Sequence, residues 1–235
     1  MLTISNLSKS YTPGKFAVNN LSLTIEDGDI YGFIGHNGAG KTTTLKAITG
    51  ILPYDNGTVI FNGIDLAKEP IKFKSNLAYI PDNPDIYESM SGIKYINFIA
   101  DLYETPQDIR DANIRRFGDA FEMTQHLGSP ISSYSHGMKQ KLVLISALVH
   151  EPKLLVLDEP FVGLDPKAAH ILKQLMHDIC KKGGSIFFST HVLEVAEKLC
   201  NKIAIIKNGE LIRSGNTDEV RGDSSLEDLF LELAE

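Results

Sequence analysis

The stretch Gly35-His36-Asn37-Gly38-Ala39-Gly40-Lys41-Thr42 fits the pattern G-x-x-x-x-G-K-[ST] of phosphate-binding loops. The apolar segment Ile30–Ile34 leads into it as an expected strand, and Thr43–Ile48 leads out of it as an expected helix. This context matters because such a loop works only where a strand turns into a helix. The stretch therefore predicts a nucleoside triphosphate site, and a chance glycine-rich turn is the weaker alternative.

The residue types of this loop each suit contact with phosphate. The glycines let successive backbone N–H groups converge on one point, and the helix that follows adds positive potential at its N-terminus. Lys41 can supply a full positive charge to the outer phosphates, and Thr43 can donate a hydrogen bond to an inner one. The Thr42 hydroxyl can bind Mg²⁺. We therefore expect Gly35–Thr43 to bind nucleotide and Thr42 to bind the metal.

Length, composition and charge limit the classes of protein that are possible. The chain has 235 residues, of which 43% are hydrophobic and 23% are charged, as is ordinary for a globular protein of one large or two small domains. Cys180 and Cys200 lie far apart and suggest neither a metal cluster nor a disulfide framework, so a reducing cytoplasm fits best. The net charge of −7 argues against a general nucleic-acid or anionic-lipid surface.

No apolar run approaches the roughly 20 residues that a membrane-spanning helix needs. The longest run, Leu142–Val149, is interrupted by Ser146, and the N-terminus does not resemble a signal peptide. We therefore expect no direct membrane insertion, so that any membrane role would act through a partner.

Strands and helices are expected in three successive patterns. The first part of the chain predicts strands separated by turns, at Leu2–Leu7, Ala17–Ile25, Ile30–Ile34, Thr58–Asn62 and Leu77–Ile80. From Ser91 to Val149 apolar residues recur near the helical period, which predicts helices at about 93–102, after Pro106 and at 137–149. In the last part of the chain, expected strands alternate with expected helices. The strands are Lys153–Leu157, Ser185–Ser189 and Lys202–Lys207, and the helices are Pro166–Lys181, Val192–Leu199 and Leu226–Leu233. This order predicts an α/β fold with a mostly parallel sheet covered on both faces and a helical insertion.

Two acids follow the apolar segment Leu154–Leu157. A strand this apolar is buried, so Asp158 and Glu159 are expected at the mouth of the sheet, where ligands bind in open α/β folds. Asp158 can hold Mg²⁺ through its water shell, and Glu159 can accept a proton from an attacking water. The alternative is an ordinary strand end followed by a solvated turn.

Three other segments carry weaker signals. His191 follows an apolar strand and can contact a γ-phosphate, although a helix cap or a surface position is the more common role. Ser135 can cap the helix that contains Gly137, leaving free N–H groups for an anion, and a simple capped helix is the favoured interpretation from physics alone. Tyr11 can stack on an adenine or can simply pack.

The order of these motifs resembles the ATP-binding subunit of ABC transporters over essentially the whole chain. The motifs are, in order, the phosphate loop, the helical insertion, Ser135–Gly137, Asp158–Glu159, Gly163–Asp165 and His191. This resemblance implies a P-loop NTPase core with an N-terminal antiparallel β-subdomain and an inserted α-helical subdomain. It implies ATP and Mg²⁺ as cofactors. The implied roles are Tyr11 and Val18 at the nucleoside, Lys41, Glu159 and His191 in catalysis, Asp158 at the metal, and Ser135 and Gly137 at the γ-phosphate of a partner subunit.

The sequence departs from the family pattern in two segments. The signature segment usually reads Leu-Ser-Gly-Gly-Gln, and here Tyr134, His136 and Met138 replace three of those residues. Asp82 stands where most members carry a glutamine that reaches the metal and the lytic water. Asp82 is one methylene shorter and adds negative charge, so it can reach Mg²⁺ only through water or after loop movement. Its alternative role is to begin the turn that it forms with the next two residues.

The resemblance also implies an organisation and a set of partners. We expect one domain over residues 1–235, with 1–82 and 151–235 as catalytic core and β-subdomain and 83–150 as helical subdomain. The segment 86–103 resembles the drug, antibiotic and polysaccharide exporter branch. We expect a homo- or heterodimer on the inner, cytoplasmic face of the membrane, with a transmembrane permease docking near Asp82–Ser91.

Two other functions stay open from the sequence. One is a soluble ABC-type ATPase acting as a ribosome- or nucleic-acid-associated switch, although the fused cassettes, coiled coil or basic extensions usual in such proteins are absent from the sequence. The other is a nucleotide sensor without a transport role.

Overall fold

The computed structural model describes residues 1–83 and 86–234. Its N-terminal part contains a four-stranded antiparallel sheet in the order β2-β1-β4-β5. These strands are β1 (Leu2–Thr12), β2 (Lys15–Ile25), β4 (Asn56–Phe61) and β5 (Ile64–Asp65). Leu2 and Ile4 of β1 point to the buried face, as the alternation of side chains in a half-exposed sheet requires.

A six-stranded sheet in the order β10-β9-β3-β8-β7-β6 forms the centre of the molecule. Its strands are β3 (Ile30–Ile34), β6 (Leu77–Ile80), β7 (Leu154–Asp158), β8 (Ser185–Thr190), β9 (Lys202–Lys207) and β10 (Glu210–Asn216). The neighbours from β9 to β6 are parallel, and β10 pairs antiparallel with β9. The strands β3, β7 and β8 are buried along their whole length, which explains their nearly continuous apolar sequences.

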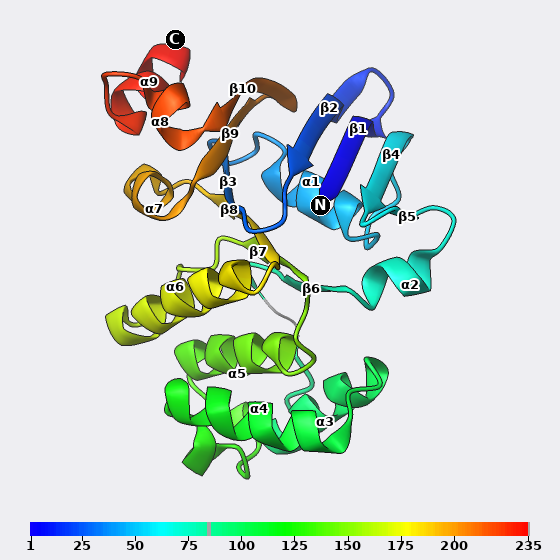
Figure 1. Cartoon of the computed structure of the whole chain (residues 1–235), viewed down its shortest axis with the longest axis vertical. Coiled ribbons are helices and arrows are strands. Elements are labelled where there is room, and N and C mark those ends of the chain that lie inside the picture. Colours follow the sequence, from blue (N-terminus) through cyan, green and yellow to red (C-terminus); the bar gives the residue numbers. More distant parts are fainter. Residues whose placement is uncertain (84–85, 235) are drawn as a thin grey trace.

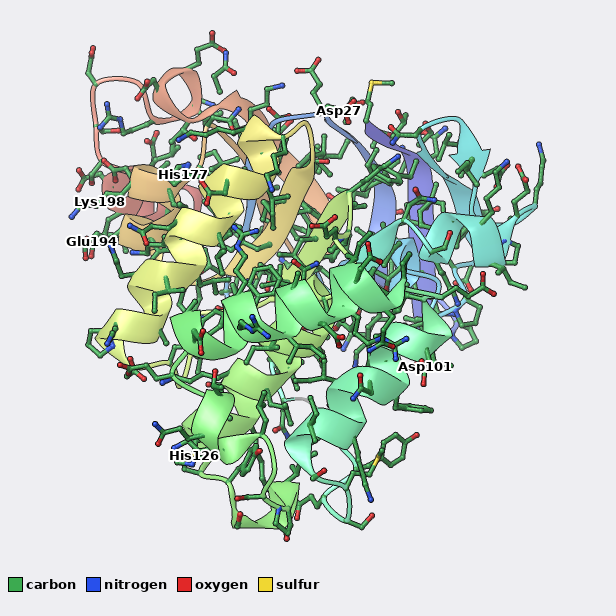
Figure 2. All side chains as sticks on the ribbon, turned by 60° about the horizontal axis from the view of Figure 1, so that its bottom comes forward. Asp27, Asp101, His126, His177, Glu194 and Lys198 are labelled. Atoms are coloured by element: carbon green, nitrogen blue, oxygen red, sulfur yellow. The ribbon has the colours of Figure 1, made fainter. Side chains whose placement is uncertain are left out.

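Helices cover both faces of this sheet, as Figure 1 shows. They are α1 (Lys41–Ile48), α2 (Pro70–Lys74), α3 (Gly92–Leu102), α4 (Gln107–Ala120), α5 (His136–Leu148), α6 (Pro166–Lys181), α7 (Leu193–Leu199), α8 (Thr217–Arg221) and α9 (Leu226–Ala234). The helices α3, α4 and α5 lie together at the bottom of Figure 1 and form a layer inserted between β6 and β7. Arg110 of α4 forms an ion pair with Asp101 of α3, which Figure 2 labels. None of the helices among the described residues is long and apolar enough to span a membrane.

The central strands separate two hydrophobic cores. Ile30 and Ile34 of β3 face the core that includes the α3–α5 layer, and Tyr31 and Phe33 face the core beneath the antiparallel sheet and α1. Because successive side chains of a strand point to opposite faces, one apolar strand fills both cores. The sheet is therefore held from both sides, and its edge beyond the carboxyl ends of the strands is a rigid platform.

The predicted α/β class, with its mostly parallel sheet and N-terminal antiparallel strands, is confirmed. The first strand is longer than predicted and continues to Thr12. A bulge, with Asn6 at a φ of 52°, interrupts the alternation of buried and exposed side chains, and the strand continues beyond it. The strand β10 and the helices α2 and α8 were not predicted. Most of β10 is exposed, and α2 buries only Phe73, so neither leaves a strong apolar period in the sequence.

Candidate functional site

The sheet brings the predicted site segments to a single edge. In the parallel pairing of β3 with β8, Ile34 lies opposite Thr190, and in that of β7 with β8, Asp158 lies opposite Ser189. The phosphate loop, the pair Asp158–Glu159 and His191 therefore all follow the carboxyl ends of adjacent strands. This edge is where ligands bind in open α/β sheets.

The loop Gly35–Gly40 folds around the ammonium group of Lys41. Lys41 is buried, and its Nζ donates to the carbonyl oxygens of Gly35 at 2.6 Å and His36 at 3.3 Å. Gly40 has a φ of 109°, and a Cβ there would lie 2.3 Å from the carbonyl oxygen of Ala17, so only glycine fits. The middle of the loop, residues 36–38, is exposed, so its backbone faces solvent beside the start of α1. This arrangement can cradle phosphate.

Asp158 is almost fully buried and is held by two hydroxyl groups. Thr42 donates to its Oδ2 at 2.6 Å, and Ser189 donates to its Oδ1. The adjacent Thr42 hydroxyl and Asp158 carboxylate are oxygen donors of the kind that Mg²⁺ prefers, and this cation usually keeps several waters and takes few protein ligands. The residues present therefore fit Mg²⁺.

Asp82 lies just beyond β6, on the same edge. Its side chain is exposed and accepts a hydrogen bond from the Asn83 N–H at 2.8 Å, and it lines a small hollow together with Asp158 and Glu159. Burial, together with the negative charges of Asp158 and Asp82, raises the pKa of Tyr79 on β6. The described residues contain no group of three or more acids, histidines or cysteines placed to hold a metal by themselves.

Glu159 occupies the centre of the edge. Its Oε1 lies 3.4 Å from Lys41 Nζ, and its Oε2 lies 2.9 Å from His191 Nδ1. Its backbone N–H donates to the Ser189 hydroxyl at 3.0 Å, and its φ of 48° is in the left-handed region, which is uncommon for a glutamate. The carboxylate thus lies between a cation and an imidazole, where it can accept a proton from a water molecule. His191 keeps its Nε2 available for another group.

The two residues expected at the nucleoside lie in contrasting environments. Tyr11 is 64% exposed, and its hydroxyl lies 3.3 Å from the Thr43 hydroxyl, so its ring is open to stacking beside the loop. Val18 is fully buried in the core beneath the antiparallel sheet. In this structure the Val18 side chain packs in that core and presents no surface to a nucleoside.

The segment Ser135–Gly137 forms the first turn of α5. Ser135 is the N-cap, and its hydroxyl accepts a hydrogen bond from the Met138 N–H at 3.3 Å. Ser135 and His136 are both exposed. Within the described residues, the hydrogen bonds and ion pairs do not join this helix end to the phosphate loop of the same chain.

Two site residues were not predicted, Ser189 and Gln140. Ser189 links β7 and β8 through its bonds to Asp158 and Glu159, and Gln140 of α5 donates from Nε2 to the Val162 carbonyl oxygen at 2.6 Å. The signal for Ser189 was its position at the end of an apolar strand, next to the threonine that precedes His191. No sequence signal marked Gln140, because only the fold places α5 beside the loop after β7.

Comparisons with known proteins show similarity over most or all of the chain. A family model described as "ABC transporter" matches residues 18–162. The ABC-type transporter ATP-binding protein EcsA of Bacillus subtilis (strain 168) is 35% identical over 238 residues, covering 99% of this chain and 96% of that protein. A solved ATP-binding subunit of an ABC transporter has a TM-score of 0.96 and 33% identity, with full coverage of both chains. A dimeric ATP-binding cassette, MJ0796, solved in a post-hydrolysis state with ADP and Pi, has a TM-score of 0.84 at 21% identity and covers 92% of this chain and 99% of its own, which shows the common fold.

Proposed function

We propose, from the premise that this chain belongs to the ABC transporter family, that its sheet edge forms one half of an ATPase site shared between two subunits. The chain is the ATP-binding subunit of an ABC transporter, and it hydrolyses ATP to energise transport. The roles of individual residues, the metal and the partners given below are parts of the proposal.

The observation that carries the proposed mechanism is the position of Glu159 between Lys41 and His191. Phosphoryl transfer to water depends mainly on positioning and on neutralising charge. Lys41 and the loop N–H groups stabilise the charge that develops on the γ-phosphate during in-line attack. Glu159 accepts the proton of the attacking water, and His191 orients both the carboxylate and the phosphate. When bound, Mg²⁺ supplies further neutralisation of phosphate charge, held by Thr42 and, through water, by Asp158 and Asp82.

The other half of the site comes, in this proposal, from the α5 N-terminus of a second subunit. Ser135 and Gly137 present a capped helix start to solvent, and the positive end of a helix attracts phosphate. In their own chain they are not bonded to the loop, which fits a role in a neighbouring site. A homodimer or a pairing with a related subunit both satisfy this requirement. Tyr11 stacks on the adenine in each site.

The remaining proposals concern organisation and the membrane partner. We assign residues 83–150 as the helical subdomain and 1–82 with 151–235 as the catalytic core. The permease is expected near Asp82–Ser91, of which residues 84 and 85 lie outside the described residues. Tyr87 is 60% exposed and packs against Tyr95 and Phe98 of α3, an aromatic surface that suits an amphipathic helix of the permease. The subunit would lie on the cytoplasmic face of the membrane, and its similarity in 86–103 to the exporter branch favours export.

The variant Glu159→Gln tests the central assignment. It keeps the shape of the side chain and loses the base, so turnover should fall about 100-fold or more while ATP binding is retained. Phosphate release gives the rate, and size-exclusion chromatography with ATP reports a trapped dimer. Glu227→Gln on α9 is a matched control at an exposed position and should behave as wild type. Wild-type turnover in Glu159→Gln would remove Glu159 as the base.

The membrane partner needs a separate experiment. Purification of the native complex in detergent, followed by mass spectrometry, should recover a polytopic membrane protein in stoichiometric amount. A ribosomal or nucleic-acid complex in its place would favour the switch function.

A further inference from the structure

Gln140 and Lys141 of α5 both contact the loop that follows β7: Lys141 forms an ion pair with Asp165 at 2.6 Å, and Gln140 reaches the part of the loop next to Glu159. The Nε2 of Gln140 donates to the carbonyl oxygen of Val162 at 2.6 Å. The Val162 N–H in turn donates to the carbonyl oxygen of Glu159 at 3.2 Å and closes a turn. Two hydrogen bonds therefore connect the Gln140 side chain, 22 residues away from Val162 in sequence, to the backbone of Glu159.

The backbone of Glu159 needs such support. Its φ of 48° is a sparsely populated conformation for a residue with a Cβ, and such conformations persist only when the surrounding structure holds them. On the β8 side, Ser189 accepts a hydrogen bond from the Glu159 N–H. On the α5 side, the bond from Gln140 to Val162 holds the following residues of the turn. A carboxylate that must meet a water molecule in line is sensitive to small displacements of this backbone.

The fit between Gln140 and the turn involves packing as well as hydrogen bonding. Gly163 has a φ of 80°, and a Cβ at this position would lie 2.6 Å from Gln140 Oε1. The amide of Gln140 therefore lies directly against the glycine, where a larger residue would displace it. Gln140 also lines the small hollow that Asp158 and Glu159 line, and its buried Oε1 has no hydrogen-bond partner among the residues that the structure describes. A side chain of another shape would change both the turn and this hollow.

We propose that Gln140 is a positioning residue for the ATPase reaction, which sets the backbone of Glu159 through the Val162 carbonyl. This inference rests on the proposed function, in which Glu159 accepts the proton of the attacking water. Under this proposal the position of the Glu159 carboxylate depends on the helical layer, because α5 carries both Gln140 and the helix start at Ser135. A displacement of α5 relative to the sheet would therefore move Glu159 and change the rate of hydrolysis.

Steady-state ATP hydrolysis by the full chain tests this role with two variants. Gln140→Leu removes the hydrogen bond with little change in volume, and Gln140→Glu places an acceptor against the Val162 carbonyl. Both should lower kcat by about 10-fold or more and leave KM for ATP within about 2-fold, because ground-state binding does not involve the turn. Gln174→Leu, the same substitution at an exposed position of α6, is the matched control. Binding of a fluorescent ATP analogue shows that each variant is folded.

The decisive measurement combines each change with Glu159→Gln. If Gln140 acts through the Glu159 carboxylate, Gln140→Leu should reduce the already slow rate by less than about 2-fold in that background, since residues that act as a unit are not additive. Losses that multiply, a rise in KM with unchanged kcat, or wild-type kcat in both single variants would each overturn the proposal. A fast Glu159→Gln variant would instead refute the proposed base. The inference alone fails when Glu159→Gln is slow and the Gln140 variants give any one of those three results.

Discussion

The sheet edge and the N-terminus of α5 carry the two halves of the proposed site, and they are built in opposite ways. At the sheet edge Lys41 and Asp158 are buried; Lys41 donates a hydrogen bond to the phosphate loop, and Asp158 accepts hydrogen bonds from Thr42 of α1 and Ser189 of β8. At the start of α5, Ser135 and His136 are exposed, and Ser135 makes only the local bond of a helix cap. One half is therefore held together within the chain, while the other is an exposed surface that, in the proposed function, binds a second subunit.

The cost of burying charge explains this difference. An unpaired charge in a protein interior is strongly unfavourable, so Lys41, Asp158 and Glu159 must be partnered as soon as the chain folds. A helix start that remains in water needs no such partners, because solvent satisfies its N–H groups. The buried groups of the sheet edge are thus fixed by their partners when the chain folds, whereas the α5 start is stable in water and is free, under the proposed function, to bind and leave a neighbouring subunit.

Among the predicted changes, removal of the Lys41 ammonium group from the sheet edge should have the largest effect. Lys41→Met deletes the charge that holds the loop and faces the phosphates, so ATP affinity should fall about 100-fold. Isothermal titration calorimetry with ATP and Mg²⁺ measures it. Lys46→Met, one turn further along α1, is the control and should bind as wild type. Unchanged affinity in Lys41→Met would show that the loop alone binds phosphate.

The opposite end of α5, far from the exposed start at Ser135, should make the stability of the fold depend on pH through His150, which follows the helix. His150 stacks on Tyr103, the residue after α3, at a ring separation of 3.6 Å, and burial lowers the pKa of His150 to about 4 from an ordinary value of 6.5. The unfolded chain therefore binds the proton first, and stability that is present above pH 6.5 is lost as the pH falls toward 4. At pH 5 the loss should be about 2 kcal/mol of unfolding free energy.

The variant His150→Phe should keep the ring stack with Tyr103 and remove this loss of stability at low pH. Urea unfolding at pH 7 and pH 5 measures the difference, with the exposed His170→Phe on α6 as control. If wild type and His150→Phe lose equal stability between the two pH values, burial of this imidazole does not cause the pH dependence of stability.

The smallest expected effect concerns the shared site. Ser135→Ala should slow hydrolysis about 10-fold, because it removes one hydroxyl from the helix start. Mixing it with Lys41→Met should restore activity to about a quarter of the wild-type value, because random pairing makes half of the dimers mixed and each mixed dimer has one intact site. No recovery on mixing, measured by phosphate release, would place Ser135 in the site of its own chain.

The sequence and the fold contributed differently to these conclusions. The phosphate loop and the acids after β7 were recognisable because each lies in a short segment whose strand or helix has a clear apolar period. The place of Val18 at the nucleoside stays a prediction from the resemblance, and the structure shows its side chain buried in the core. The edge strand β10 and the short helix α2 were missed because pairing with β9 and burial of a single phenylalanine stabilise them, and neither effect leaves a periodic pattern.

By itself, the sequence determined the α/β class, the phosphate loop and the identity of the acids, because these depend on local periodicity and on fixed residue types at short spacing. Only the tertiary structure decided that Glu159 lies between Lys41 and His191, that Ser189 links two strands, and that Gln140 reaches the turn after β7. The physical reason is that these contacts join segments far apart in the chain. Their geometry arises from strand order and from the packing of α5 against the sheet, which no local pattern records.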